Sequence, residues 1–550
     1  MISDTAYKEL EDALGSSNVS REPSVLDGYA WQPSFNTDPA IWVHRPVAVA
    51  LPASTEEIQV VVRACNKHGL KFKAFSTGWG AHGGPTTDDV VQIDLRRMDR
   101  ILEIDDRNMY AVVEPYVNGA QLQAEAMKLG LNTHIIGAGP ACSPLASATA
   151  CWGVGWDGPF MSYSPRNLMG VEWVLPSGDL LRLGALGCGG GWFCADGPGP
   201  SLRGIMRGYV GAMGGNGVYT RCALKLFHWP GPPQTEGSGK LLDFRAEVPR
   251  ELKFYMCFFP DEKRFADAGY KVGEAEIGYL VSKSPMPSYF LCLLPHLFKK
   301  IRVKPALRAV VRDSLKYLLM VVMAADSPQE MRYEELAMKE IISQCGGLGL
   351  ELFQSTPSLG SMFWMNFIRV TIIPLIYRVG GQFSTGWPKD ETWDVLVEYA
   401  DRCEATKREW IEAGGILDDM GDCAFTTLYE NSHYAHCEEI FTYDPRNQRH
   451  LEAIDPLSID FAITAIEQCM EQGFNFEPRM RKLFNPLLGH YNHWQKKISE
   501  NLDPAGAADT GFYTGEEDFD LSALDDEKRK RLLRLIEERT WTEPIPPQKA

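Results

Sequence analysis

Ser76-Thr77-Gly78-Trp79-Gly80-Ala81-His82-Gly83-Gly84-Pro85 joins two β-like runs, residues 70–75 and 90–95, and is the strongest chemical signal in the chain. Its successive small residues let several backbone N–H groups point into one concavity, which can hold a phosphate without a basic side chain. Ser76 and Thr77 add hydroxyl donors. A glycine-rich connection is otherwise an ordinary turn. This one is not a G-x-G-x-x-G motif at the start of a helix, so a classical dinucleotide fold is not indicated. We expect a phosphate-binding loop between two strands.

Length and composition set limits on the rest of the chain. Its 550 residues predict two or more domains, and 45% apolar with 23% charged residues is the mix of a globular protein. The net charge of -17 argues against DNA or RNA as a partner, because nothing would offset phosphate repulsion. The first residues show no charged-then-apolar leader, and no apolar run approaches the roughly 18 to 20 residues of a membrane span. We expect a soluble, cytoplasmic protein.

The cysteines give no sign of a metal centre. There are 13, an odd number, and no C-x-x-C pair occurs. This argues against classical zinc or iron–sulfur ligation, and reduced thiols in a cytoplasm fit better than a disulfide framework. We predict no bound metal.

The pattern of apolar residues divides the chain into five segments. Residues 1–44 are a helical lead-in, 45–230 an α+β domain with glycine-shaped turns, 231–480 a second domain, 481–514 a segment that returns to the first domain, and 515–550 a tail. Within the first domain we expect strands over residues 47–51, 90–93, 111–113 and 171–175 and helices over 55–68 and 119–129.

Six further motifs flank the glycine-rich loop in a fixed order. The first begins at Arg45 (R-P-V-A-V-A-L-P). The other five are Asp94–Asp105, Ala111–Val117, Arg166–Gly184, Gly214–Leu226 and Leu502-Asp503-Pro504. Together they resemble the FAD-binding domain of the vanillyl-alcohol oxidase and p-cresol methylhydroxylase family. The resemblance covers about 45–230 and 480–514. It implies an α+β fold, with a two-lobed FAD-binding domain of the p-cresol methylhydroxylase type at 45–230 and an α+β substrate (cap) domain at 231–480.

The resemblance also implies which residues contact FAD. The loop from Ser76 through Thr77, Gly78, Trp79, Gly80, Ala81, His82 and Gly83 wraps the pyrophosphate. A second turn carries Ser147, Thr149, Gly153 and Gly155 and lies close to the ribityl chain and the ring. A third turn carries Gly217, Val218 and Thr220, and Pro52 lies near the adenine. For each glycine the alternative is a tight turn.

Covalent attachment of the flavin is known in this family and stays open here. His82 lies in the pyrophosphate loop where some relatives carry a histidyl link, although Gly80 occupies the usual position. Cys142, in G-P-A-C-S-P, lies where some relatives form a cysteinyl link. The alternatives are a loop histidine and a buried small thiol.

The second domain should supply the substrate contacts. The flavin needs a substrate C–H placed over it and a group that accepts the O–H proton, and histidine is the natural proton acceptor near neutral pH. His433 and His436, within Tyr429–Glu439, are our catalytic candidates. If residues 429–441 form one strand, the two point to opposite faces. If the segment bends, they and Glu438 could ligate a metal. The alternative is a polar strand edge.

Arg378 and Tyr163 complete the catalytic candidates. A lone arginine in an apolar run is costly to bury without an anion, which a carboxylate or phenolate substrate would provide. An internal salt bridge is the alternative. Tyr163 and Arg166 lie where the relatives place a group near the flavin ring. Before Leu502 the chain lacks the tyrosine–arginine pair of the phenol-oxidising relatives and has His490-Tyr491-Asn492-His493 instead.

Residues 291–317 interleave seven lysines and arginines with apolar residues in an otherwise acidic protein. Such a segment can rest on an anionic membrane surface, dock an acidic partner, or form a solvated helix face. We therefore expect a small-molecule substrate, an electron-accepting protein as a candidate partner, a peripheral membrane contact as an alternative role of 291–317, and a homo- or hetero-oligomer.

These features predict an FAD-linked oxidase or dehydrogenase acting on CH–OH or CH groups. The substrate would be an alcohol, an alkylphenol-like compound or another hydrophobic small molecule, oxidised by hydride transfer to the flavin. The alternatives are a 2-hydroxyacid dehydrogenase, a non-redox use of FAD as in ether-lipid synthase relatives, and a flavin electron-transfer subunit of a larger complex. The electron acceptor stays open between oxygen, a cytochrome, a quinone and an electron-transfer flavoprotein.

Overall fold

The computed structural model describes most of the chain. The described residues are 1–30, 44–78, 83–150, 153–194, 196, 202–206, 216–240, 244–283, 305–371, 382–422, 424–468, 470, 478–487, 491–511, 514–515 and 518–538.

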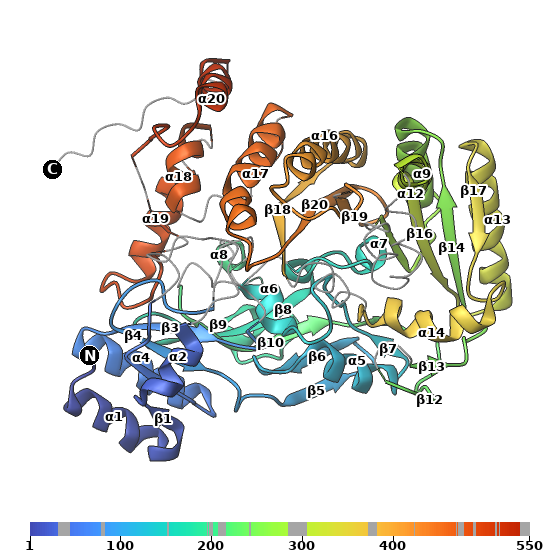
Figure 1. Ribbon diagram of the computed structural model, residues 1–550. Helices are drawn as coiled ribbons and strands as arrows, with labels where there is room; N and C mark the ends of the chain where they lie inside the picture. Colours follow the sequence, from blue (N-terminus) through green and yellow to red (C-terminus); the bar gives the residue numbers. More distant parts are fainter. Residues whose placement is uncertain are drawn as a thin grey trace.

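A four-stranded sheet of order β1-β2-β4-β3 carries the glycine-rich loop (Figure 1). Its strands are β1 (Val19–Ser20), β2 (Ala48–Ala50), β4 (Val90–Asp94) and β3 (Lys71–Phe75). β2, β4 and β3 are parallel, and β1 is antiparallel to β2. Because carboxyl ends of parallel strands lie at one edge of a sheet, the segments that follow β2 and β3 meet there.

Helix α4 (Thr55–His68) connects β2 to β3 and closes this sheet on one side. Ser54 caps its first turn by accepting from the Glu57 N–H, and Gly69 ends it in the left-handed conformation. Its apolar face, which includes Ile58 and Val61, is buried in the same core as the sheet. The N-terminal helices α1 (Asp4–Leu14) and α2 (Pro23–Ala30) lie beside it.

A five-stranded antiparallel sheet of order β5-β6-β10-β8-β9 forms the second part of this region. Its strands are β5 (Ile101–Asp105), β6 (Tyr110–Val113), β10 (Val218–Lys225), β8 (Leu168–Val174) and β9 (Leu180–Leu183). Between β6 and β8 the chain forms α5 (Gly119–Met127), β7 (Leu131–Asn132), α6 (Pro144–Thr149), α7 (Gly158–Met161) and the 3-10 turn η2 (Ser164–Asn167). The strands and helices predicted for residues 47–175 are confirmed, with ends that differ by at most three residues.

A seven-stranded antiparallel sheet of order β17-β14-β16-β15-β19-β20-β18 forms the rest of the core. Its strands are β17 (Leu348–Glu351), β14 (Leu252–Phe258), β16 (Leu318–Ala324), β15 (Leu280–Lys283), β19 (Ala424–Tyr429), β20 (Tyr434–Tyr443) and β18 (Gln382–Glu391). One face packs on α9 (Glu262–Glu274), α13 (Pro328–Gln344), α16 (Trp393–Glu412) and α17 (Gln448–Glu467). The other face lies toward the five-stranded sheet (Figure 1), and α14 (Pro357–Ile368) shares its core.

Shorter elements complete the described chain. They are η1 (Ser16–Asn18), η3 (Gly184–Cys188), α8 (Arg203–Met206), β11 (Phe227–His228), β12 (Gly237–Ser238), β13 (Arg245–Ala246) and α12 (Pro305–Lys316). Within the described part, no helix combines the length and the apolar character that crossing a membrane requires.

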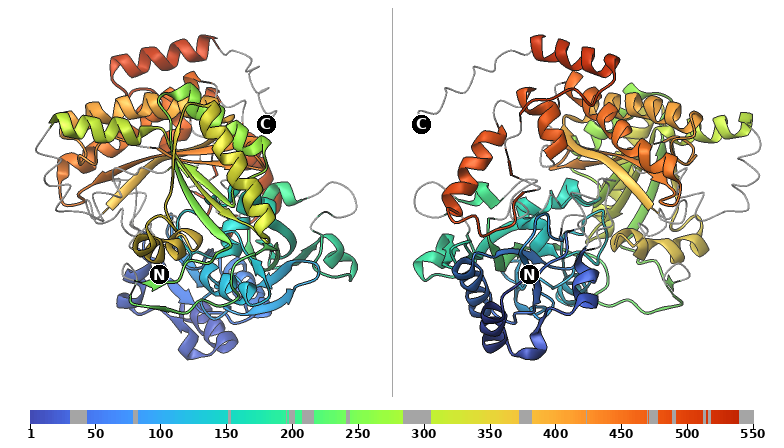
Figure 2. Two further views of the ribbon diagram at one scale, coloured as in Figure 1. Left: turned by 90° about the vertical axis from the view of Figure 1, so that its right-hand side faces the viewer. Right: turned by 60° about the vertical axis from the view of Figure 1, so that its left-hand side comes forward.

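The C-terminal part of the chain returns to the first sheet. After α18 (Pro478–Phe484), η7 (Asn485–Leu487) and α19 (Tyr491–Leu502), Ala508 forms a parallel bridge with Phe72 of β3. The Phe72 N–H donates to Ala507 O at 2.8 Å, and the Asp509 N–H donates to Phe72 O at 2.9 Å. Helix α20 (Asp526–Glu538) then packs on α17, at the opposite end of the molecule from α1 (Figure 2).

The mixed α+β class predicted from the sequence is confirmed, because the described chain combines three multi-stranded sheets with covering helices. The five-segment division of the chain stays a prediction.

Candidate active site

The glycine-rich loop leaves the carboxyl end of β3 and is fixed to its surroundings at its start. Ser76 Oγ donates to the carbonyl oxygen of Pro115. Thr77 Oγ1 accepts from the Ser143 N–H at 3.1 Å, which ties the loop to the first turn of α6. Ser76 and Thr77 therefore lie between the parallel sheet and the segments that precede β8.

Two glycines mark the described ends of this loop. Gly78 has a φ of +73°, and a Cβ there would lie 2.6 Å from Phe75 Cζ, so a larger residue would be strained. At the far end, Gln92 Nε2 donates to Gly83 O at 3.0 Å. Four predicted loop residues lie outside the described residues: Trp79, Gly80, Ala81 and His82.

Two further predicted contacts adjoin the loop. Pro52 is buried and follows β2 at the same carboxyl edge of the sheet. Cys142 is 6% exposed and immediately precedes Ser143, the residue that holds Thr77. The Gly119 N–H donates to Cys142 O at 2.9 Å, which fixes the backbone beside α5.

Ser147 and Thr149 are buried within α6, and their hydroxyl groups donate to that helix. Ser147 Oγ donates to Ser143 O and Thr149 Oγ1 to Leu145 O, each at 2.8 Å. Their hydroxyl hydrogens are thus used by the fold, and only their oxygen lone pairs stay available for a ligand.

The turn 153–157 approaches other parts of the chain so closely that glycine is required at two positions. A Cβ on Gly153 would lie 2.2 Å from Ser164 Oγ, and a Cβ on Gly155 would lie 2.2 Å from Ile135 O and 2.8 Å from Asp157 Oδ1. Protein packing alone therefore accounts for both glycines, whatever ligand the turn contacts.

A buried imidazole–carboxylate pair holds this turn. His134 Nδ1 is hydrogen-bonded to Asp157 Oδ1, and its Nε2 lies 3.2 Å from Gly153 O. Asp157 Oδ2 accepts from the Ile135 N–H at 3.0 Å. Both side chains are only 5% exposed. No sequence motif marked this pair.

The third predicted turn is also shaped by internal contacts. Gly217 has a φ of +116°, and a Cβ there would lie 2.2 Å from Val174 O. Val218 is buried, and Thr220 Oγ1 donates to Glu172 Oε1 at 2.9 Å. The turn enters β10 next to β8, in the middle of the five-stranded sheet.

The inner face of the seven-stranded sheet brings His436 to this region. In β20, His436 pairs with Thr427 of β19 on one side and with Asp390 of β18 on the other. Cross-strand partners share a face of a sheet. Thr427 Oγ1 donates to Gly155 O at 3.2 Å, so this shared face looks onto the 153–157 turn.

His436 lies between two carboxylates. Its Nδ1 is 2.8 Å from Asp390 Oδ1 and its Nε2 is 3.2 Å from Glu438 Oε1. Burial lowers the pKa of His436, but its hydrogen bonds to both carboxylates outweigh this effect and raise that pKa to about 9. Burial raises the pKa of Asp390. The imidazole is fully buried, whereas the Glu438 side chain is 27% exposed, so Glu438 is the member that a ligand can reach.

An aromatic cluster connects the seven-stranded sheet to the segment after α7. The Tyr163 ring lies 5.4 Å from the Tyr429 ring and 6.1 Å from the Tyr434 ring. Arg166 Nε donates to Tyr163 Oη at 3.1 Å and lies 3.7 Å from Glu430 Oε1. Burial raises the pKa of Tyr434, and nearby Tyr163 and Glu430 raise it further. Tyr163 thus lies at the junction between β19–β20 and the first half of the chain.

His433 does not share the position of His436. Residues 429–441 do not form one strand, because Glu430, Asn431 and Ser432 have positive φ and turn the chain between β19 and β20. His433 ends this turn and is exposed. No cluster of His, Cys, Asp or Glu suited to a metal ion occurs in the described part of the chain.

Two sequence predictions lie wholly or partly outside the described residues. Arg378 and its neighbour Tyr377 lie outside the described residues. Of the basic stretch 291–317, the structure describes α12 and Tyr317. Lys316 pairs there with Asp401 at 3.1 Å and with Glu404 at 3.4 Å, so part of its charge is neutralised within the chain.

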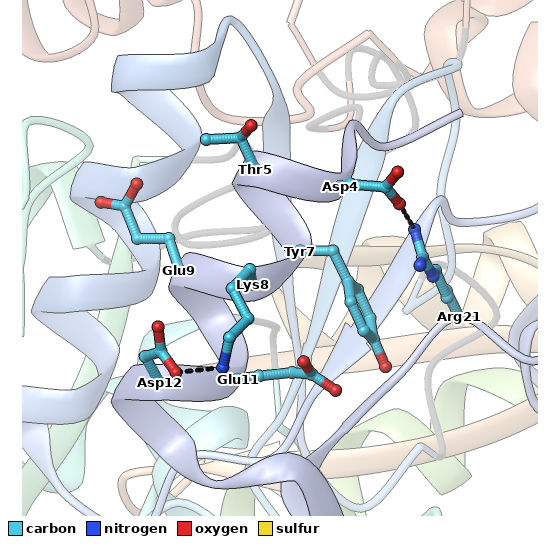
Figure 3. A pocket seen from close by; sticks show the side chains of 8 residues that line it. All are labelled: Asp4, Thr5, Tyr7, Lys8, Glu9, Glu11, Asp12 and Arg21. Carbon is cyan, nitrogen blue, oxygen red and sulfur yellow. Dashed lines mark hydrogen bonds and ion pairs between the residues drawn. The ribbon is translucent and has the colours of Figure 1, made fainter.

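A separate hollow lies on the surface of α1, far from this region (Figure 3). It is lined by Asp4, Thr5, Tyr7, Lys8, Glu9, Glu11, Asp12 and Arg21. Arg21 pairs with Asp4 and Lys8 with Asp12. Its charged groups are exposed and largely paired with one another, so it offers no buried polar group to a ligand.

Comparison with known proteins identifies one domain of the chain. Residues 46–184 match the family of FAD binding domains. Over 174 residues the chain is 25% identical to an FAD-linked oxidoreductase of Mycobacterium tuberculosis, a match that spans 32% of this chain and 37% of the relative. It is 29% identical to the flavoprotein subunit of the hydroxylating 4-cresol dehydrogenase of Pseudomonas putida over 240 residues, 42% of this chain and 43% of the relative. The chain thus spans less than half the length of these curated relatives.

The fold comparison extends over nearly the whole chain. The crystal structure of p-cresol methylhydroxylase with substrate bound matches with a TM-score of 0.73 at 17% identity, covering 92% of this chain and 96% of that chain. Residues 46–184 are therefore an FAD-binding domain, and FAD is the cofactor. The described chain has the p-cresol methylhydroxylase fold, and the predicted resemblance to the vanillyl-alcohol oxidase and p-cresol methylhydroxylase family is confirmed.

Proposed function

We propose that this protein is an FAD-dependent oxidoreductase that oxidises a hydrophobic organic substrate at a CH–OH group or at the activated C–H group of an alkylphenol-like compound. The observation that carries the proposal is the Asp390–His436–Glu438 cluster on the sheet face that looks onto the 153–157 turn. A relative named 4-cresol dehydrogenase and a fold neighbour named p-cresol methylhydroxylase support it.

The described residues fit FAD in the first half of the chain. The left-handed Gly78 follows the carboxyl edge of the parallel sheet, and hydrogen bonds at Ser76 and Gly83 fix the described ends of the loop. We assign the cofactor contacts to Pro52, Ser76, Thr77, Gly78, Gly83, Ser147, Thr149, Gly153, Gly155, Gly217, Val218 and Thr220. When bound, FAD supplies the redox chemistry by accepting a hydride from the substrate carbon.

The chain itself must take up the proton that an alcohol or a phenol releases. Glu438 is the partly exposed carboxylate of the cluster, so it accepts this proton. His436 is a positioning residue. With its pKa raised to about 9, it stays protonated near neutral pH and holds Glu438 by donating from Nε2, while Asp390 fixes Nδ1.

The residues around the cluster favour an apolar or aromatic substrate. Phe425 and Ile440 belong to the apolar core on the same face of the sheet, and the Phe425 ring lies 6.3 Å from the His436 ring. Tyr163 and Tyr434 border this face at the end of the β19–β20 hairpin. Such a lining buries hydrocarbon surface and leaves Glu438 as the polar contact.

Several expectations complete the proposal. The odd number of cysteines suits a reducing, cytoplasmic location. An electron-accepting protein partner fits a dehydrogenase, and the flavoprotein subunit among the relatives supports it.

Covalent attachment through His82 or Cys142 is tested by denaturing gel electrophoresis: fluorescent flavin that stays with the chain supports it, and released flavin excludes it.

The test is an anaerobic screen for flavin bleaching. Alcohols, 4-alkylphenols and 2-hydroxyacids are added to the FAD-loaded protein, and loss of flavin absorbance is followed in a stopped-flow instrument. We expect an alcohol or a 4-alkylphenol to bleach the flavin, and Glu438→Gln to slow this by roughly 100-fold or more because a general base is removed. Glu452→Gln, an exposed change on α17, should leave the rate unchanged.

Two outcomes would contradict the proposal. Bleaching only by 2-hydroxyacids would favour a hydroxyacid dehydrogenase. A flavin that dithionite or a reduced protein partner reduces, but that no small substrate bleaches, would indicate an electron-transfer subunit. An unchanged rate in Glu438→Gln would remove that residue from its assigned role.

A further inference from the structure

The last turn of α2 reaches the ends of the two strands that flank the glycine-rich loop. Phe75 ends β3 and Asp94 ends β4, and the two residues are partners in the parallel ladder. Tyr29 of α2 contacts both of them. Its hydroxyl group donates to Asp94 Oδ2 at 2.5 Å, and its ring meets the Phe75 ring edge to face, with the ring centres 5.5 Å apart. One side chain from the N-terminal segment thus holds the carboxyl ends of β3 and β4.

An arginine completes the contacts around the Tyr29 hydroxyl group. Arg96 donates to Asp94 Oδ2 from Nε at 2.9 Å and from Nη2 at 2.6 Å, and its Nη2 also donates to Tyr29 Oη at 3.1 Å. Burial raises the pKa of Tyr29, and the hydrogen bond to Asp94 raises it further, so the hydroxyl group keeps its proton near neutral pH. The Asp94 carboxylate is fully buried. Hydrogen bonds to a buried charge are strong, and this network therefore fixes the Tyr29 ring.

The Phe75 ring connects Tyr29 to the loop. Phe75 directly precedes Ser76, the residue whose hydroxyl group is bonded to Pro115 O. A Cβ on Gly78 would lie 2.6 Å from Phe75 Cζ, so the ring lies against the backbone of this left-handed glycine. The same ring therefore contacts Tyr29 and the described start of the glycine-rich loop, and the position of Tyr29 limits the positions that the ring and the loop can adopt.

We propose that Tyr29 is a positioning residue that holds the start of the glycine-rich loop, through Phe75, in the conformation that binds FAD, and thereby slows release of the cofactor. A loop that is fixed before binding loses less conformational entropy when its ligand binds. The match to FAD binding domains covers residues 46–184, and α2 lies outside this range. The inference depends on FAD binding and not on the proposed reaction, so its test and the bleaching screen can fail separately.

The experiment compares two Tyr29 variants in the full-length, FAD-loaded protein. Tyr29→Phe keeps the ring and loses the hydrogen bond to Asp94, whereas Tyr29→Leu also loses the aromatic contact. FAD release is followed after dilution by the rise of free flavin fluorescence. We expect release to be roughly 3- to 10-fold faster in Tyr29→Phe and roughly 10- to 100-fold faster in Tyr29→Leu. The matched control is Tyr7→Phe, because Tyr7 of α1 also donates a hydrogen bond, to Val19 O at 3.2 Å. It should leave the release rate unchanged.

Amide hydrogen exchange of the FAD-loaded proteins separates positioning of the loop from general support of the fold. In both Tyr29 variants we expect faster exchange in the peptide that begins at Ser76 and unchanged exchange in α4, which packs on the same sheet. Equal increases in both segments would reduce Tyr29 to a support of the whole sheet and overturn the inference. Unchanged FAD release and unchanged loop exchange would also overturn it. If the flavin is covalently attached, the exchange alone decides, and if Tyr29→Leu does not fold, Tyr29→Phe decides.

Discussion

His436 carries a positive charge at a position with no exposed surface. A buried charge is tolerated only when hydrogen-bond acceptors replace the water molecules that would otherwise solvate it. Here Asp390 accepts from Nδ1 and Glu438 accepts from Nε2. The same geometry that keeps the imidazole protonated prevents it from acting as a base near neutral pH. The histidine predicted from the sequence thus lies in the candidate site, but its chemistry follows from its neighbours.

The raised pKa of His436 predicts a pH-dependent stability. A group whose pKa is higher in the folded state stabilises fully below its unfolded value of 6.5 and loses this contribution as the pH rises through about 9. The shift corresponds to about 3 kcal/mol of unfolding free energy. We expect the difference in unfolding free energy between the unaltered protein and His436→Gln to be largest at pH 6 and to shrink by pH 10.

Chemical denaturation at a series of pH values measures this difference, and titratable groups that do not contact His436 cancel. His433→Gln, an exposed change three residues away, serves as the control. A constant difference for His436→Gln across the whole range would contradict the imidazolium–carboxylate cluster.

At the scale of elements, the 153–157 turn connects the FAD-binding domain to the seven-stranded sheet. His134 and Asp157 hold it from one side. From the other side, Thr427 Oγ1 donates to Gly155 O, and the Val281 N–H donates to Trp156 O at 2.9 Å. Because the turn is hydrogen-bonded on both sides, it fixes the seven-stranded sheet relative to the FAD-binding domain.

Asp157→Asn tests the role of the buried pair. The change keeps an acceptor for the Ile135 N–H but replaces the carboxylate that faces His134, and removing one partner of a buried hydrogen bond costs about 1 to 3 kcal/mol. We expect a lower melting temperature and faster release of FAD. The matched control is Asp326→Asn, because His228 and Asp326 form an exposed pair at 2.8 Å that is worth less than about 1 kcal/mol. Equal effects of the two changes would show that the turn does not depend on this pair.

The sequence predicted local elements better than the contacts between them. Strand runs such as 90–93 and the helix 55–68 are marked by apolar periodicity and by caps, which are local signals. Asp390, however, reaches His436 across 46 positions through the register of β18 with β20, and nothing local to Asp390 indicates that pairing. The sequence also leaves the turn at Glu430–Ser432 open as one of two alternatives, because none of these residues is glycine.

At the scale of the whole molecule, the C-terminal part of the chain supports the glycine-rich loop. Asp509 Oδ2 accepts from the Thr86 N–H at 2.7 Å, and Asp509 Oδ1 accepts from Thr86 Oγ1. Lys73 Nζ of β3 lies 3.7 Å from the same carboxylate. Thr86 directly follows the loop 76–85, so a residue 423 positions away fixes the segment by which the loop rejoins the sheet.

Asp509→Asn should therefore weaken FAD binding from a distance. The amide cannot accept from both Thr86 donors as a carboxylate does, and it removes the negative charge that lies 3.7 Å from Lys73 Nζ, a loss of about 2 to 3 kcal/mol. We expect a lower melting temperature and more free flavin fluorescence after ultrafiltration. Asp520 is exposed and accepts a hydrogen bond from the Ser522 N–H. Asp520→Asn should therefore change the melting temperature and the free flavin fluorescence only slightly. If Asp509→Asn loses stability but retains FAD fully, the C-terminal segment supports the sheet alone. Only a loss of both stability and bound FAD would show that the segment around Asp509 and the glycine-rich loop form one cofactor site.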